Sequence, residues 1–136
     1  HDAQYKDRDT FNQFIFIGSD APALTIGHIK KSIEALKSYD HVIGPALDGG
    51  FYLLGSRIPI HHTIWESVEY SRITTFESIY NKLLGSKFIL PNLSDLDEAS
   101  DLINVIEDLK EIEHKLYSSQ IIFLEFIKKI FYLKNL

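Results

Sequence analysis

The chain alternates between short apolar runs and longer amphipathic segments. Four short stretches have the length and largely apolar character of strands, namely residues 14–17, 41–45, 51–55 and 87–91. The first of them, residues 14–17, is an unbroken apolar run, as expected for a strand that is buried on both faces. Helical spacing of apolar side chains marks residues 25–39 and 74–84, and again the stretch that follows Asp97 and continues to Leu116. Residues 56–73 follow neither pattern. Strands that alternate with helices predict an α/β fold, a three-layer sandwich around a mostly parallel sheet.

The C-terminal segment, residues 119–136, predicts an amphipathic helix appended to an α/β domain over residues 1–118. Between Ile121 and Leu133, four side chains define its polar face: Glu125, Lys128, Lys129 and Tyr132. The remaining arc is apolar and wide, so we expect this domain or a second copy of the chain to cover it, as in a homodimer. Attachment to a membrane surface is the alternative, and two lysines support it only weakly.

Composition narrows the range of functions. The chain has 136 residues and a net charge of −5, so no basic stripe is available to neutralise phosphates and we expect no nucleic-acid partner. Cysteine is absent, which excludes disulfides and a thiol nucleophile and fits a cytoplasmic location. No apolar run reaches the roughly eighteen residues of a transmembrane helix. The histidines lack metal-ligand spacing, and we interpret them as surface or loop residues.

The first strand ends in a loop that carries a candidate ligand. Gly18 frees the backbone to turn, which places Asp20 just past the carboxyl end of the strand. Open α/β sheets bind their ligands at that edge. Pro22 keeps the residue before it out of helical geometry, so Asp20 stays on a short loop. A metal or phosphate ligand is one interpretation of Asp20, and a turn or helix-cap acid is the other.

The loop between the second and third strands is the other candidate. Gly49 and Gly50 would let backbone N–H groups approach a ligand without an intervening Cβ. Asp48 directly before them has the chemistry to accept hydrogen bonds from a sugar hydroxyl or to help hold a cation. An Asp-Gly turn in a hairpin explains the same residues without any ligand.

Three segments taken together resemble a known family. They read Gly-Ser-Asp-Ala-Pro-Ala-Leu-Thr at 18–25, Gly-Pro-Ala-Leu-Asp-Gly-Gly-Phe-Tyr-Leu-Leu-Gly at 44–55 and Asp-Leu-Asp-Glu-Ala-Ser-Asp-Leu at 95–102. In this order they resemble a bacterial family of GT-A-like candidate glycosyltransferases, long grouped as a domain of unknown function. That family is related to the nucleotidyltransferases that activate sugars and molybdopterin.

The resemblance implies roles for particular residues. Asp20 would bind a divalent cation, Mg²⁺ or Mn²⁺, on the diphosphate of a nucleotide sugar or another small-molecule substrate. Asp97 or Asp95 would complete the metal site, and Asp48 would face the donor or acceptor sugar as the second catalytic acid beside Asp20. Substrate contacts would come from Ser19, Pro22, Gly49, Gly50, Tyr52, Tyr70 and Ser71.

Several departures from the family pattern leave alternatives open. Tyr70 and Arg72 stand where the family has tryptophan and threonine, and Glu98 replaces a capping threonine, so Asp97 is also a candidate helix cap. Only thirteen residues precede Phe14 and none is glycine, so we expect the nucleotide-binding half of the fold to be lacking and this chain alone to be inactive. The chain is then a glycosyltransferase or part of one, a non-catalytic binding module, or a nucleotidyltransferase.

Overall fold

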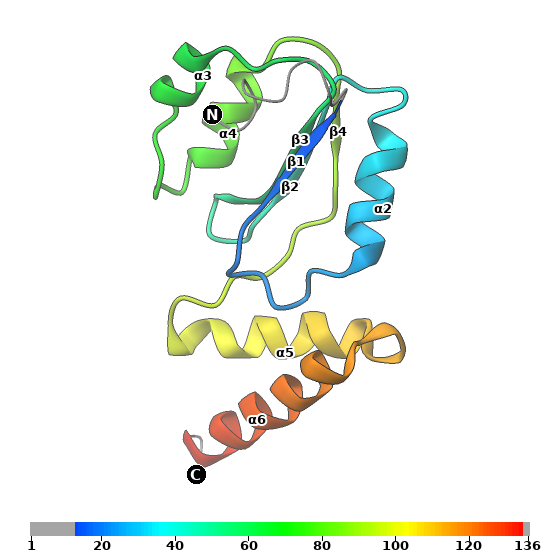
Figure 1. The fold of residues 1–136 in the computed structure, drawn as a ribbon. Helices are drawn as coiled ribbons and strands as arrows, with labels where there is room; N and C mark the ends of the chain where they lie inside the picture. The colour runs from blue at the N-terminus through cyan, green and yellow to red at the C-terminus, as the bar shows by residue number, and fades with distance from the viewer. Residues whose placement is uncertain (1–12, 135–136) are drawn as a thin grey trace.

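The computed structural model describes residues 13–134 and has an α/β fold with one four-stranded sheet (Figure 1). The strands are β1 (Phe14–Ile17), β2 (His41–Pro45), β3 (Phe51–Ser56) and β4 (Lys87–Ile89). The helices are α2 (Ile26–Ala35), α3 (His62–Ser67), α4 (Thr75–Lys82), α5 (Leu102–Glu111) and α6 (Ser118–Lys134). All four predicted strands are therefore present within two residues of their expected ends.

The sheet has the order β1-β3-β2-β4, and three of its strands point in the same direction. Strand β3 lies between β1 and β2 and pairs with both in antiparallel register, while β2 and β4 pair in parallel. The predicted predominance of one strand direction is therefore confirmed, but only one of the three strand pairs is parallel. Because β1, β2 and β4 share a direction, the loops that leave their carboxyl ends emerge at the same edge of the sheet.

Two apolar clusters, one on each face of the sheet, make the fold a three-layer sandwich. Neighbouring residues of one strand face opposite sides: Val42 belongs to the cluster with α2, α5 and α6, and Ile43 belongs to the cluster with α3 and α4. Leu53 and Leu54 divide in the same way. Figure 1 shows α3 and α4 on one side of the sheet and α2 on the other. Cover on both faces of the sheet explains the largely apolar strand sequences.

Several details differ from the sequence-based expectations. Helix α2 ends at Ala35 rather than residue 39, and the helix that starts at Leu102 ends at Glu111 before a 3-10 turn. The segment without a pattern contains the short helix α3, at whose start the imidazole of His61 accepts a hydrogen bond from the backbone N–H of Thr63 (3.3 Å). His41 is buried rather than exposed, and its Nε2 lies 2.7 Å from the carbonyl oxygen of Leu84.

The predicted C-terminal helix is present as α6 and packs on α5 (Figure 1). Leu124 and Ile127 are buried in the same cluster as the sheet and α2. The side-chain amide of Gln120 donates hydrogen bonds to the carbonyls of Pro22 (2.9 Å) and Leu24 (3.1 Å), in the loop after β1. None of the described helices is both long and apolar enough to cross a membrane.

Candidate functional site

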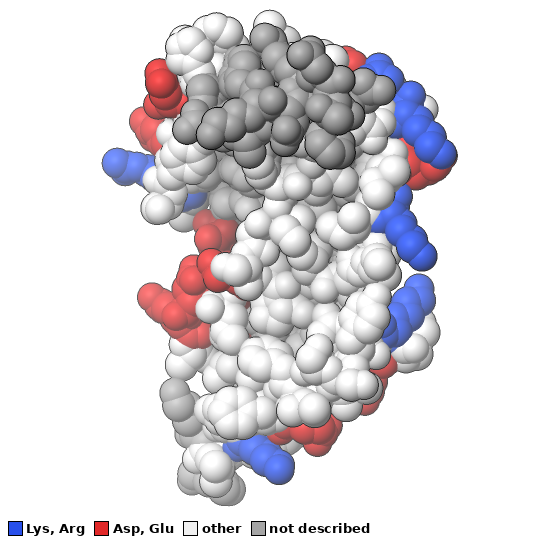
Figure 2. All heavy atoms as spheres, viewed as in Figure 1, with Lys and Arg blue, Asp and Glu red and all other residues white. Residues whose placement is uncertain are grey.

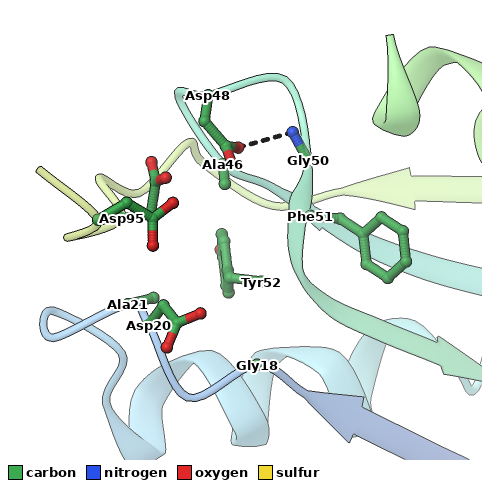
Figure 3. A pocket seen from close by; sticks show the side chains of 10 residues that line it. Gly18, Asp20, Ala21, Ala46, Asp48, Gly50, Phe51, Tyr52 and Asp95 are labelled. Carbon is green, nitrogen blue, oxygen red and sulfur yellow. Dashed lines mark hydrogen bonds between the residues drawn. The ribbon is translucent and has the colours of Figure 1, made fainter. Parts of the chain in front are cut away.

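A pocket opens at the edge of the sheet where β1 and β2 end and β3 begins. Three loops form it: one follows β1, one joins β2 to β3, and one follows β4 (Figure 3). Its lining residues are Gly18, Asp20, Ala21, Ala46, Asp48, Gly50, Phe51, Tyr52, Asp95 and Asp97. Figure 2 shows acidic side chains gathered beside an indentation on the left of the molecule. Among these described lining residues, four are acidic and none is basic.

Backbone hydrogen bonds between the loops fix the walls of this pocket. The N–H of Gly18 donates to the carbonyl of Tyr52 (2.8 Å), which extends the pairing of β1 and β3. The N–H of Leu47 donates to the carbonyl of Leu93 (3.0 Å), and the N–H of Leu96 donates to the carbonyl of Asp20 (3.1 Å). The loop after β4 is therefore tied to both other loops, which makes the relative positions of the acids a property of the fold.

Three of the acids converge on one point. One carboxylate oxygen from each of Asp48, Asp95 and Asp97 lies within 4.8 Å of the other two. Partial burial, followed by the nearby charges of Asp48 and Asp97, raises the pKa of Asp95 to about 6. Three carboxylates form the oxygen donor set that Mg²⁺, Mn²⁺ and Ca²⁺ prefer, and a cation between them would relieve their mutual repulsion. The residues therefore fit a hard divalent cation.

Asp20 lines the same pocket but does not belong to this trio. Its side chain is exposed and accepts a hydrogen bond from the hydroxyl of Ser19 (3.0 Å). Figure 3 shows it on a different loop from Asp48 and Asp95, with Tyr52 near the centre of the view. Asp20, Asp95 and Asp97, which the sequence suggested as metal ligands, all line one pocket. The group of three close carboxylates, however, contains Asp48 in place of Asp20.

The two glycines of the β2–β3 loop form a turn, which was the alternative to ligand contact by their N–H groups. The N–H of Gly50 donates to the Asp48 carboxylate (2.7 Å), and the N–H of Gly49 donates to the carbonyl of Ala46 (3.1 Å), so both are engaged within the loop. Gly49 has a φ of +91°, and a Cβ there would lie 2.0 Å from the carbonyl oxygen of Ile73. Glycine is thus required for backbone conformation and close approach, and the turn orients Asp48.

The helix-cap alternative for Asp97 does not describe this structure. The residue before the 3-10 turn Ala99–Asp101 is Glu98, and its backbone N–H donates to the carboxylate of Asp101 (2.8 Å). The N–H of Asp97 donates to the same carboxylate (3.1 Å). Asp101 therefore satisfies the backbone at the start of this turn, and the side chain of Asp97 lines the pocket instead.

Tyr52 forms the apolar wall of the pocket and anchors the loop that carries Asp95 and Asp97. Its hydroxyl donates to the carbonyl of Pro91 (2.9 Å), and burial raises the pKa of this phenol well above its usual range. The ring lies against Gly44, where a Cβ would come within 2.4 Å of it. The ring of His28 meets the other side edge-on, with centroids 5.9 Å apart. Gly44 therefore makes room for the tyrosine.

Five of the sequence-predicted contacts do not line the pocket: Ser19, Pro22, Gly49, Tyr70 and Ser71. The hydroxyl of Tyr70 donates to the carbonyl of Trp65 (3.1 Å), so it ties α3 to the following loop. Ser19 reaches the site only through Asp20. Gly18, Ala21, Ala46 and Phe51 also line the pocket and were not predicted from the sequence. The available signal was the presence of small residues near the acids of both loops.

Comparisons with known proteins bear on the family and the fold. The model of a protein family described as "Uncharacterized protein conserved in bacteria (DUF2064)" matches residues 2–72. A crystal structure of a candidate nucleotide-diphospho-sugar transferase from Desulfovibrio desulfuricans G20 matches 95% of this chain with a TM-score of 0.77 and 24% identity. This chain spans 59% of the length of that protein, and the likeness concerns the fold. No curated protein matches the chain.

Proposed function

This chain belongs to the bacterial DUF2064 family, and we propose that it forms the metal-binding part of a glycosyltransferase that uses a nucleotide-activated sugar. One observation carries the proposal: the carboxylates of Asp48, Asp95 and Asp97 converge in a pocket at the carboxyl edge of the sheet. This is the edge at which open α/β sheets bind ligands. The fold that the chain shares with a candidate nucleotide-diphospho-sugar transferase supports the choice of substrate class.

In this proposal Asp48, Asp95 and Asp97 hold one Mg²⁺ or Mn²⁺ ion. The ion would neutralise charge that develops on the departing diphosphate. The three side chains supply only part of a six-oxygen shell, so substrate phosphate oxygens and water would complete it. The turn from Ala46 to Gly50 orients Asp48, and the Tyr52–Pro91 hydrogen bond supports the loop of the other two acids.

Asp20 is proposed to act on the sugar rather than on the metal. It is the lining acid outside the trio, it is exposed, and the Ser19 hydroxyl fixes one of its oxygens. A carboxylate in this position can accept a hydrogen bond from a sugar hydroxyl, or take its proton as that oxygen attacks. Ala21 and Ala46 leave room beside it because neither has a side chain beyond Cβ.

Titration with Mn²⁺ tests the metal site directly. We expect weak binding to the chain, weakened at least about tenfold by Asp48→Asn, Asp95→Asn or Asp97→Asn. Glu107→Gln is the matched control, because Glu107 is an exposed acid on α5 and its loss changes the charge equally. Asp20→Asn should leave Mn²⁺ binding within about twofold of the parent chain. Equal losses in Glu107→Gln and the three site variants would contradict a specific metal site.

Calorimetry with UDP-, GDP- and CDP-sugars, with and without Mn²⁺, tests the substrate class. Binding of one of them that requires Mn²⁺ and is weakened by Asp20→Asn would support the transferase proposal. Mn²⁺ binding without any nucleotide sugar would favour the binding-module alternative. Cleavage between the α- and β-phosphates of a nucleoside triphosphate would favour a nucleotidyltransferase.

A further inference from the structure

The outer face of α6 exposes several large apolar side chains. Its inner face packs on the domain through Leu124 and Ile127, which are 1% and 2% exposed, respectively. On the outer side five large side chains are 46–72% exposed: Ile121, Ile122, Phe126, Tyr132 and Leu133. Figure 2 shows the lower part of the molecule, where α6 lies, as mostly uncharged. Soluble monomers rarely leave this many large apolar side chains of one helix in water.

The spacing of the exposed side chains is that of a coiled-coil seam. Ile122, Phe126, Lys129 and Leu133 follow one another at intervals of four, three and four residues, all on the exposed side of the helix. Alternation of three and four is the heptad pattern, in which the side chains of one helix insert between those of another. The one charged member, Lys129, is the kind of seam residue that fixes register and the number of helices at some cost in stability.

The charged residues in and beside the seam favour a second copy of α6 as its partner. Glu125 lies beside the seam and pairs with Lys128 of its own helix (3.2 Å), whereas Lys129 makes no ion pair among the residues that the structure describes. If a second α6 packs antiparallel so that Ile122 meets Leu133 of the other copy, then Lys129 meets Phe126 and lies next to Glu125. Two-fold symmetry repeats this contact, so the face is complementary to itself.

We propose that the seam Ile122–Phe126–Lys129–Leu133 is a homodimer interface in which two copies of α6 pack antiparallel. The inner attachment of α6, including the hydrogen bonds from Gln120 to the loop after β1, holds this face in place without the partner. A helix of 17 residues is about 25 Å long. One pair of such helices buries less than the roughly 800 Å² per partner of a tight complex, so the dimer is expected to dissociate in the micromolar range.

Sedimentation velocity over a micromolar concentration series, with the complete chain, is the test. We expect a monomer–dimer equilibrium that Phe126→Glu weakens at least about tenfold, because it places a charge in the seam. Leu84→Glu is the matched control: Leu84 is 77% exposed but lies far along the chain from α6, and its substitution should not change dimerisation. Circular dichroism at a concentration where the parent is monomeric checks that each variant is folded.

An exchange of charges at Glu125 and Lys129 tests the antiparallel register without any substitution at Phe126. Lys129→Glu should weaken the dimer severalfold by placing acid against Glu125 of the other copy, and the double exchange Glu125→Lys with Lys129→Glu should restore it. A folded parent that stays monomeric at all concentrations would overturn the proposal. So would a dimer that Phe126→Glu or Lys129→Glu leaves intact, or a monomer that sediments with anionic phospholipid vesicles instead.

Discussion

Aspartates near the two ends of strand β2 are in opposite electrostatic situations: Asp40 directly precedes the strand, and Asp95, on the loop after β4, lies close to Asp48, which follows the strand. At the starting end, the Asp40 carboxylate accepts hydrogen bonds from Nε (3.1 Å) and Nη2 (2.9 Å) of Arg57. It also accepts from the backbone N–H (2.9 Å) and hydroxyl (3.1 Å) of Ser86. These partners, the Ser86 backbone N–H first, lower the pKa of Asp40 below its usual range. At the other end, burial and neighbouring acids raise the pKa of Asp95.

The difference separates a carboxylate that serves the fold from one that is available to a ligand. Asp40 has donors on both oxygens and holds the start of β2 to the turns before β4 and after β3. Asp95 faces two other acids and has no basic residue in its pocket lining. A fold gains nothing from gathering like charges, because they repel unless a cation lies between them. The pocket end is therefore the end that we assign to function.

Substitution of the two glycines with positive φ should give the largest loss of stability. A Cβ at Gly49 would lie 2.0 Å from a backbone carbonyl oxygen, and a Cβ at Gly85 (φ +99°) would lie 2.5 Å from the Asp40 side chain. We expect Gly49→Ala to lower the free energy of unfolding by about 2–4 kcal/mol and Gly85→Ala by about 1–3 kcal/mol. Urea denaturation measures both. If Gly85→Ala lost as much stability as Gly49→Ala, or more, the backbone carbonyl of Ile73 would move away as easily as the side chain of Asp40.

Asparagine substitutions of Asp95 at the pocket end and of Asp40 at the opposite end of the sheet should have separate effects on metal affinity and on stability. Asp95→Asn is expected to weaken Mn²⁺ binding at least about tenfold and to leave the apo protein as stable as the parent or slightly more so, since repulsion is relieved. Asp40→Asn should lower the melting temperature, because it removes an ionised acceptor of four hydrogen bonds. Its Mn²⁺ affinity, measured below the melting transition, should match the parent. Loss of Mn²⁺ binding in Asp40→Asn would break the comparison.

Local patterns predicted most of the scaffold because burial imposes them. Apolar clusters cover both faces of the sheet, so the strand sequences are largely apolar, and α2 and α4 show helical spacing for the same reason. The direction of β3 was not predictable in this way: an antiparallel strand buried on both faces has the same kind of run as a parallel one. Helix α3 has six residues, too few for a recognisable period.

The four acids that line the pocket were singled out from the sequence, but their arrangement was not predictable. The family resemblance singled out Asp20, Asp48, Asp95 and Asp97, and all four line the pocket. That Asp48 rather than Asp20 joins the other two depends on contacts between distant segments, such as the bridge between Ala46 and Leu93. The glycine N–H groups were expected to contact a ligand, because a sequence does not show that Asp48 and Ala46 already accept their hydrogen bonds.

Removal of the Gln120 side chain should have a moderate effect that is confined to the pocket end. Gln120→Ala leaves the carbonyls of Pro22 and Leu24 without their donor, so we expect a loss of about 1–2 kcal/mol in the free energy of unfolding. Hydrogen exchange should rise in residues 18–25 and stay unchanged near Asp40. Ser119→Ala is the control, because Ser119 is the exposed neighbour of Gln120 on α6. Faster exchange at both ends of the sheet would show that the loss is global.

The pH dependence of stability should show the smallest effect and the sharpest distinction between the two ends. The folded-state pKa of Asp95 is about 6, above its ordinary value of 3.8. Between these values the folded state keeps a proton that the unfolded state releases, so the contribution of Asp95 to stability falls as pH rises through this window. The folded-state pKa of Asp40 lies below 3.8. The contribution of Asp40 to stability is therefore complete above pH 3.8 and is lost as the pH falls through the folded-state pKa.

Urea denaturation of the apo parent and of Asp95→Asn, from acidic to neutral pH, isolates the first effect. The free energy of unfolding of the parent, relative to that of Asp95→Asn, should decline from about pH 4 to about pH 6 and then stay level. The total decline should be less than about 1 kcal/mol, because Asp95 is only partly buried. Saturating Mn²⁺ should reverse the slope, since the ion binds the ionised carboxylate and is repelled by the protonated site. The difference in unfolding free energy between the parent and Asp40→Asn should be constant from about pH 4 upwards and should change only below about pH 4. Parallel pH curves for the parent and Asp95→Asn would mean that the acids at the pocket end do not interact, and the case for a cation between them would fail.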